Sequence, residues 1–170
     1  MKFKFLFAVI AIASVACSKN NNDNTSLNNE DNYFMQQASY ANYAEINAGA
    51  LASVKGNTDS VKMFGVMMVS DHGKAQSSLD SLGTKFNVTL PNTADSVHQA
   101  MYAVLQLQSG KTFDTMYMNG QVNDHIATVA LFQKEIAEGN NAMVKNFATV
   151  NLPIIQMHLQ DAENIRALLQ

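Results

Sequence analysis

Apolar residues recur at steps of three and four along most of the chain. This spacing places them on one face of an α-helix, and glycines fall mostly between the periodic stretches. The pattern therefore predicts an all-α domain with four long helices and one shorter helix. The long segments cover about 31–55, 59–86, 112–138 and the stretch from Gly139-Asn140 to Gln170, and the shorter one covers about 93–109.

Turn residues divide these segments into two hairpins. Gly56-Asn57 ends the first helix, and Gly139-Asn140 separates the last two. Asp31 is the predicted cap of the first helix, since a short polar side chain can accept a hydrogen bond from the free N–H groups of the first turn. Pro153 lies within the last helix, where its missing N–H predicts a kink.

The two hairpins resemble each other in sequence. A shift of 83 residues (139 − 56) superimposes three short motifs, Gly56-Asn57 on Gly139-Asn140, Val61-Lys62 on Val144-Lys145, and Phe64-Gly65 on Phe147-Ala148. Roughly 25 residues join the halves, and long crossovers of this kind are typical of ferritin-like bundles. We predict a ferritin-like four-helix bundle with a long, partly helical crossover between the second and third long helices.

Each long helix carries one titratable residue at a position of its apolar seam. These residues are Glu45, His72, His125 and His158, and counting from the turns places all four in the middle third of the bundle. Asn151 is a further polar residue on the last seam. Burying a carboxylate and three imidazoles costs several kcal/mol unless they are paired or bind an ion.

Two interpretations of this polar cluster remain open. One is a metal site in which Glu45, His72, His125 and His158 hold zinc, iron or copper. The other is a hydrogen-bonded polar layer in which Glu45 pairs with a histidine. Asp71, Asp114, Tyr117 and Asn151 are the residues predicted to surround the metal. In the hydrogen-bonded layer, Asp71, Tyr117 or Asn151 would complete the set. A di-iron centre is disfavoured, because such sites use Glu-x-x-His on two helices and this chain has none.

Two smaller patterns have alternative explanations. Met63, Met67 and Met68 precede His72 closely enough to suggest a copper(I) site, although methionines at helical spacing also fill apolar cores. His98 lies on the short helix, where we expect a solvated face.

The N-terminus has the pattern of a lipoprotein signal. Lys2 and Lys4 precede an apolar run, 5–13, which is too short to span a bilayer, and Ser14-Val15-Ala16-Cys17 resembles the site at which a lipoprotein is cut and lipidated. Cys17 is the only cysteine, and a polar, asparagine-rich stretch follows it. We predict a signal peptide (1–16), a lipidated tether (17–30) and one bundle domain (31–170), anchored in the envelope at the periplasmic face of the outer membrane.

Charge excludes one class of partner. The chain has 11 basic and 14 acidic residues, and loss of Lys2 and Lys4 leaves 9 against 14, a net charge of −5. No basic stripe remains to neutralise phosphates, so we expect no nucleic-acid binding. The chain also has no glycine-rich phosphate loop and no nucleophile motif.

Several motifs together resemble the bacterial family called domain of unknown function 4142. They span about 31–169 and comprise Gly49-x-Leu51-Ala52, Lys55 to Asn57, Val61-Lys62-x-Phe64, Met68-x-x-Asp71-His72, Phe113-Asp114-x-x-Tyr117, Asp124-His125, Lys145-x-Phe147-Ala148 and Leu152-Pro153-x-x-x-x-His158-Leu159. The resemblance implies a secreted or envelope-bound, ferritin-like bundle and brings no established reaction or ligand. We expect a non-enzymatic bundle that binds a ligand or partner, with a metal-binding redox or storage protein as the alternative.

Overall fold

The computed structural model describes residues 26–170, so the predicted signal peptide, Cys17 and most of the tether lie outside the described residues. The described part contains five helices and no strand: α1 (Asn29–Lys55), α2 (Asp59–Phe86), α3 (Ser96–Gln106), α4 (Gly110–Glu138) and α5 (Ala142–Leu168). The predicted all-helical bundle is confirmed. Among these helices, none combines the length and apolar character needed to cross a membrane.

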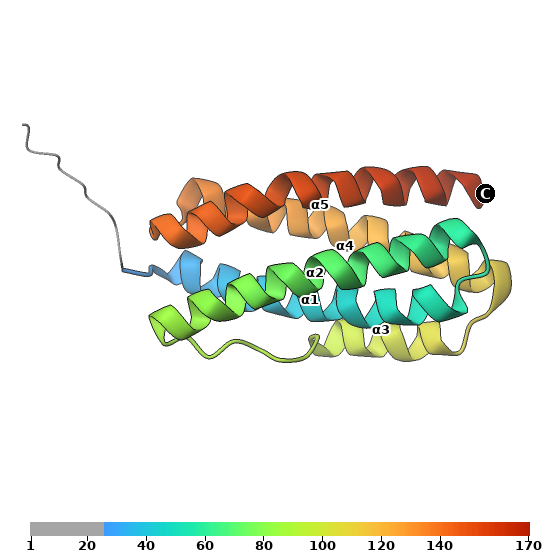
Figure 1. The fold of residues 1–170 in the computed structure, drawn as a ribbon, viewed down its shortest axis with the longest axis horizontal. Coiled ribbons are helices and arrows are strands. Elements are labelled where there is room, and N and C mark those ends of the chain that lie inside the picture. Colours follow the sequence, from blue (N-terminus) through green and yellow to red (C-terminus); the bar gives the residue numbers. More distant parts are fainter. Residues whose placement is uncertain (1–25) are drawn as a thin grey trace, which may run out of the picture.

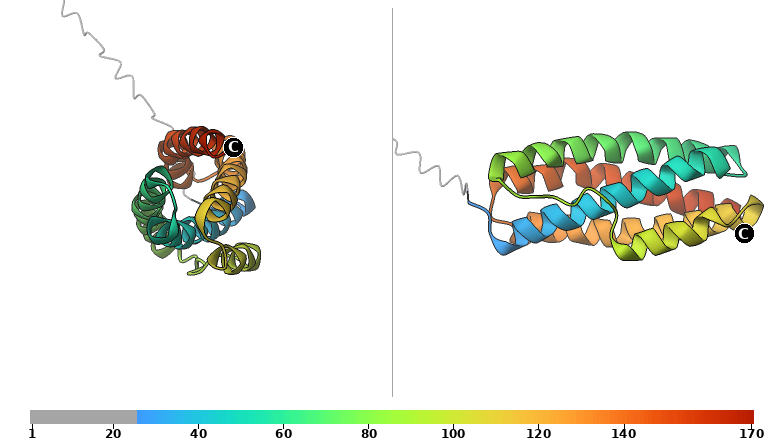
Figure 2. Two further views of the ribbon diagram at one scale, coloured as in Figure 1. Left: turned by 90° about the vertical axis from the view of Figure 1, so that its right-hand side faces the viewer. Right: turned by 90° about the horizontal axis from the view of Figure 1, so that it is seen from below.

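The four long helices form two hairpins that lie side by side (Figure 1). The α1–α2 hairpin packs against the α4–α5 hairpin through α1 against α4 and α2 against α5, and the end-on view shows the four helices around a common core (Figure 2). The segment 87–109 connects the two hairpins and runs along the outside of the bundle from one end to the other. It carries α3, which lies outside the four long helices against α1 and α4.

Capping side chains fix the helix ends and correct two predicted starts. Asn28, and not Asp31, caps α1: its side chain accepts from the Asp31 N–H at 2.8 Å, and Asp31 accepts from the Asn28 N–H at 2.6 Å. Asp95 caps α3, which therefore begins at Ser96, after the predicted start near Thr93. Helix α5 continues across Pro153.

Each hairpin turn is capped by an aspartate from the other hairpin. Asp31 of α1 accepts from the N–H groups of Asn140 and Asn141, each at 3.0 Å. Asp114 of α4 accepts from those of Asn57 and Thr58, at 2.7 and 2.9 Å. Donors and acceptors are each related by the same 83 residues (114 − 31, 140 − 57 and 141 − 58), so the sequence similarity corresponds to a structural one.

The apolar core is divided into two clusters. One contains Phe34, Leu79, Phe132 and Phe147 near the start of α1, and the other contains Val61, Phe64, Phe113 and Ala162 towards the opposite end. On every long helix the predicted titratable residue falls between the members of the two clusters. The bundle therefore has a polar layer between two apolar layers.

The predicted seam of α5 is shifted by one residue in its middle. A step of four back from His158 predicts Ile154 at the seam, but Ile154 is 38% exposed, whereas its neighbour Ile155 is 4% exposed and belongs to the core. A helix turn of 3.6 residues does not repeat in whole residues, so steps of three and four can be chosen wrongly by one position.

Candidate functional site

Three histidines from three helices meet in the polar layer. His72 of α2, His125 of α4 and His158 of α5 are 5%, 1% and 1% exposed. Their ring centroids are 5.5–5.6 Å apart. One ring nitrogen from each lies within 4.8 Å of the others, which is the arrangement of a group that could hold a metal ion.

A chain of hydrogen bonds fixes the outer side of His72. Its Nδ1 lies 3.0 Å from Oδ1 of Asn42, and Nδ2 of Asn42 donates to Gln76 Oε1 at 3.1 Å. Gln76 in turn donates to Ser39 Oγ at 2.9 Å, and Ser39 donates to the Pro91 carbonyl of the crossover at 2.7 Å. Because the Asn42 amide is oriented by Gln76, its oxygen faces His72, so His72 Nδ1 carries the proton.

The other two rings are also held from outside. His125 Nδ1 donates to the carbonyl of Gln121 at 2.9 Å, one helical turn earlier on α4. His158 Nε2 donates to Asp71 Oδ2 at 3.3 Å. An amide oxygen, a backbone carbonyl and a carboxylate thus accept one proton from each of the three rings, and these are the acceptor types that orient metal-binding histidines.

The second nitrogen of each ring has no partner in the described part of the chain. These atoms are His72 Nε2, His125 Nε2 and His158 Nδ1, and all three are buried. Since the other nitrogen of each ring carries the proton, each remaining nitrogen presents a lone pair. The polar layer therefore contains three buried acceptor nitrogens on neighbouring rings, and residues 26–170 place no donor against them.

Burial keeps the three imidazoles neutral. It lowers the pKa of His72 well below the usual value, and the neighbouring histidines add to this effect. Burial also lowers the pKa of His125, partly opposed by the bond to the Gln121 carbonyl, and that of His158. Neutral imidazoles are the form that binds a metal ion.

Glu45 lies behind His125 and not among the free nitrogens, which corrects its predicted place as a direct ligand. Its Oε1 is 3.7 Å from Nδ1 of His125, the protonated side, and its Oε2 accepts from Gln121 Nε2 at 2.6 Å. Burial, with a smaller effect of Asp124, raises the pKa of Glu45 to about 8. A seam position places a residue at the right height, but it does not decide which side of a neighbouring ring the residue faces.

The predicted surrounding residues lie in different places. Asp71 binds His158 as expected; burial alone would raise its pKa, but hydrogen bonds from Lys74 and His158 lower it. Asp114 caps the α1–α2 turn, and Asn151 donates to the Phe147 carbonyl on its own helix at 2.8 Å, so neither joins the triad. Tyr117 packs against Phe64 and Phe113 in the apolar cluster beyond it.

The methionine and His98 expectations also change. Met63 is 72% exposed, while Met68 is fully buried in an apolar cluster, so the methionines do not gather into a soft ligand set. His98 is not on a solvated face: its ring nitrogens lie 2.7 Å from Asp95 and 3.6 Å from Asp124. Hydrogen bonds with Asp124 and Asp95, opposed by burial, raise the pKa of His98 to about 9.

The sequence interpretation missed Asn42, Gln76 and Gln121. All three are at most 4% exposed and contact the residues of the polar layer. A signal was present, because Gln76 lies four residues after His72 and Gln121 four before His125, which places each amide on the same helix face as a histidine.

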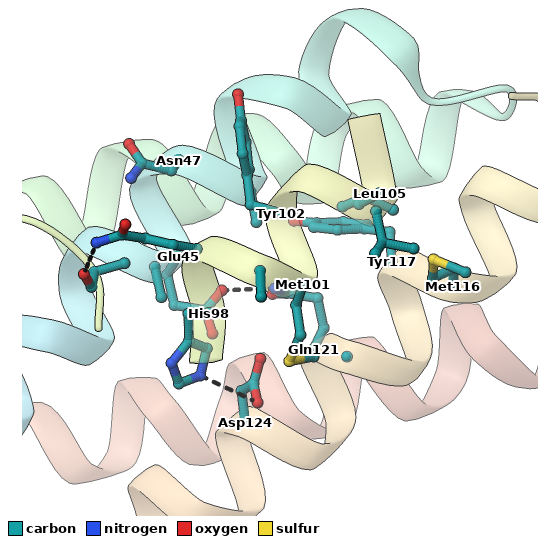
Figure 3. A pocket seen from close by; sticks show the side chains of 17 residues that line it. Glu45, Asn47, His98, Met101, Tyr102, Leu105, Met116, Tyr117, Gln121 and Asp124 are labelled. Atoms are coloured by element: carbon teal, nitrogen blue, oxygen red, sulfur yellow. Dashed lines mark hydrogen bonds and ion pairs between the residues drawn. The ribbon is translucent and has the colours of Figure 1, made fainter. Parts of the chain in front are cut away.

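A pocket of about 590 Å³ lies on the other side of Glu45, between α1, α3 and α4 (Figure 3). Its wall is largely apolar, with Met101 and Leu105 from α3 and Met116 from α4. Tyr117 and Gln121 also line it. The seam pattern does not predict this pocket, because the pocket forms where the crossover helix α3 covers the bundle.

Comparisons with known proteins identify a family and a fold. A family model described as domain of unknown function (DUF4142) matches residues 16–165. Among solved structures, the chain is similar to the crystal structure of a DUF305 fragment from Deinococcus radiodurans, with a TM-score of 0.74 and 9% identity over 83% of this chain and 97% of that one. At that identity the similarity shows a shared helical fold alone. No curated protein matches the chain.

Proposed function

We propose that this chain, which belongs to the DUF4142 family as its motifs predicted, is a non-enzymatic binding protein that holds a transition metal ion at His72, His125 and His158. The observation that carries the proposal is the convergence of three buried, unpartnered imidazole nitrogens. A hydrogen-bonded polar layer needs donors opposite its acceptors, and a single water molecule has two protons for three lone pairs. A cation satisfies all three.

Zinc suits this set of ligands best. Three neutral imidazoles with an open fourth position are a recognised zinc arrangement, whereas non-haem iron sites use carboxylates that this triad lacks. Zinc–nitrogen bonds of about 2.0–2.1 Å at tetrahedral angles place the nitrogens roughly 3.4 Å apart. The ring nitrogens lie within 4.8 Å of one another, so the distances between them need to shorten by up to about 1.4 Å on binding.

We also propose that the bundle is ferritin-like and that it works in the cell envelope. The end-to-end crossover 87–109 between two hairpins supports the first point. The Ser14 to Cys17 motif and the polar stretch after it support lipid anchoring at Cys17, with the domain facing the periplasm. In that setting a tethered bundle with one ion would store or buffer a metal near the membrane.

Metal content tests the proposed site. Protein purified without added metal is analysed for bound elements and then titrated with zinc against a competing chelator. We expect about one equivalent of zinc, and none at the triad in a His72→Ala/His158→Ala double variant. The matched control is His98→Ala, which removes a histidine between two carboxylates outside the triad and should bind zinc as the parent does.

Two results of the metal measurements would contradict the proposed site. Substoichiometric metal in the parent and the double variant alike, with both chains helical by circular dichroism, would exclude a metal at the triad. An equal loss in His98→Ala would place the ion at His98 instead.

Cys17 has its own test. Cys17→Ser should abolish labelling by a radioactive fatty acid and release the protein from membranes. Labelling that persists in Cys17→Ser would contradict the anchor and leave the metal site untouched, because the triad lies within the described domain.

A further inference from the structure

We propose that the pocket beneath α3 binds an uncharged, largely apolar small molecule that carries one hydroxyl group. The proposal is independent of the metal, since none of the three histidines lines this pocket. It rests on two residues that line the pocket, Tyr117 and Gln121, because the hydroxyl of the first and Oε1 of the second are buried and have no partner in the described part of the chain.

The two polar atoms lie on the same side of α4. Tyr117 and Gln121 are four residues apart, which places their side chains on one helix face, and each residue is 2% exposed. The Gln121 amide is oriented, because its Nε2 donates to Glu45 Oε2 at 2.6 Å and leaves the carbonyl oxygen free. A buried polar atom left without a partner is destabilising, so these two atoms indicate a bound molecule that pairs with them.

Their chemistry defines the polar group of the ligand. Tyr117 offers an O–H donor, and Gln121 Oε1 is an acceptor only. A hydroxyl group complements both at once, because it can accept from Tyr117 while donating to Gln121. A ketone would satisfy Tyr117 alone, and a hydrocarbon would satisfy neither.

The carboxyl and imidazole side chains that line the pocket have partners. Glu45 Oε2 accepts from Gln121 Nε2 at 2.6 Å. His98 contacts Asp95 at 2.7 Å and Asp124 at 3.6 Å, and Figure 3 shows its ring directed towards Asp124. No free charge is therefore offered to a charged ligand by this histidine. Among the buried side-chain atoms of the lining residues, the two without a partner belong to uncharged groups, Tyr117 and Gln121.

The remaining wall fits an apolar body. Met101, Leu105 and Met116 line the pocket, together with Ala44 and Ala48 of α1. A volume of about 590 Å³ lies within the range of about 300–1,000 Å³ that small-molecule sites occupy. Helix α3 covers the pocket and has one buried residue, Leu105, so the cover is held to the bundle by few side chains.

The test uses 1-naphthol as the probe and naphthalene as the same body without the hydroxyl. Each is titrated into the full chain carrying Cys17→Ser, so that no lipid or detergent competes, with methyl-labelled methionines followed by NMR. We expect the methyl signals of Met101 and Met116 to shift, and those of the exposed, distant Met63 and Met143 to stay. We expect 1-naphthol to bind about tenfold more tightly than naphthalene.

Two variants separate the pocket from nonspecific binding. Tyr117→Phe removes the unpartnered hydroxyl and keeps the ring, so it should stabilise the ligand-free protein against urea and reduce the preference for 1-naphthol to about threefold or less. Gly120→Leu fills the pocket, because a Cβ on Gly120 meets nothing within 4 Å, and it should abolish binding of both probes. Gly73→Leu is the matched control, with the same open surroundings but outside the pocket.

Each contrary result overturns the proposal. Equal affinity for the two probes would remove the hydroxyl argument, as would an unchanged preference in Tyr117→Phe. Shifts at Met63 or Met143 without shifts at Met101 and Met116, or binding that survives Gly120→Leu, would place the probe elsewhere. Failure of zinc binding leaves all these outcomes unaffected.

Discussion

The α1–α2 and α4–α5 hairpins share a framework and differ in what they carry. Helices α1 and α4 are followed by Gly56 and Gly139, which have similar backbone angles (φ −49°, ψ 136° and φ −61°, ψ 151°). The following helices are capped by Thr58 and Asn141, 83 residues apart (141 − 58). Asp31 and Asp114 make equivalent contacts to the opposite turns. The parts that shape the bundle are therefore duplicated.

The histidines are not duplicated. The shift of 83 residues places Asn42 opposite His125 (125 − 42), Ala75 opposite His158 (158 − 75) and Ile155 opposite His72 (155 − 72). The first hairpin supplies one ring and the second supplies two. The two hairpins therefore share their framework residues but contribute unequally to one histidine site.

Packing within the hairpins differs as well. Helices α1 and α2 touch at Gly49 and Gly65, where an added Cβ would lie 2.6–2.8 Å from the opposing backbone oxygens. The corresponding residues of the second hairpin are Phe132 and Ala148 (132 − 49 and 148 − 65 both give 83), which are larger. Gly65 precedes His72 by two turns, so close backbone contact in one hairpin holds its histidine near the bundle centre.

The largest expected effect comes from adding one methyl group at this contact. Gly65→Ala should lower the free energy of unfolding by about 2–3 kcal/mol, because the new Cβ would meet the Gly49 carbonyl and the Ser53 N–H. Urea unfolding measures the change. Gly73→Ala on the same helix is the control and should stabilise by up to about 1 kcal/mol, since nothing lies within 4 Å of its Cβ. Equal changes in the free energy of unfolding at the two glycines would show that the close contact between α1 and α2 does not contribute to stability.

The reciprocal caps should have the next largest effect. Asp114→Ala leaves the N–H groups of Asn57 and Thr58 without their acceptor and should cost about 1–3 kcal/mol. Zinc affinity measured with a competing chelator should stay within about twofold of the parent, because Asp114 lies outside the triad. A large loss of zinc affinity in a folded Asp114→Ala protein would show that this cap is needed for metal binding at the triad.

A pH difference should separate the two caps. Asp31 faces Glu135, whereas the position equivalent to Glu135 is Ala52 (135 − 52 = 83). Burial, with the nearby charge of Asp31, raises the pKa of Glu135 from 4.5 to about 8. Between these two values the folded protein holds a proton that the unfolded chain releases, so stability falls as the pH rises.

Glu135→Gln should remove this dependence. The variant should match the parent near pH 5 and be more stable by about 1–3 kcal/mol at pH 8, as measured by urea unfolding at both values. Identical pH profiles for parent and variant would contradict the assignment of the raised pKa to Glu135.

The last prediction concerns metal affinity and tests the outer hydrogen bonds of the triad. Asn42→Ala removes the acceptor that orients His72 and should weaken zinc binding about 10–100-fold, with stoichiometry unchanged. Glu45→Gln keeps the partnership with Gln121 and should change zinc affinity less than Asn42→Ala does, since Glu45 faces the outer side of His125. A larger loss of zinc affinity in Glu45→Gln than in Asn42→Ala would indicate that Glu45 binds the ion directly.

The sequence was sufficient for the helices and for the heights of the histidines, because both follow from a period of 3.6 residues and from turn residues. It did not give the direction in which side chains face around a ring. Glu45 was therefore placed on the wrong side of His125, and Asp114, which lies close to a turn only in space, was assigned to the polar layer. The pocket depends on how α3 docks, and contacts of that kind between distant segments leave no local pattern.

The reciprocal caps carry an implication for the origin of the fold. A contact in which residue i of one unit meets residue j of the other, and the reverse, is the signature of a symmetric dimer. Asp31 with Asn140, and Asp114 with Asn57, form such a pair within one chain. An ancestral homodimer of identical hairpins would have made the same two contacts between subunits. Joining the copies through the crossover would then have allowed each half to acquire its own histidines.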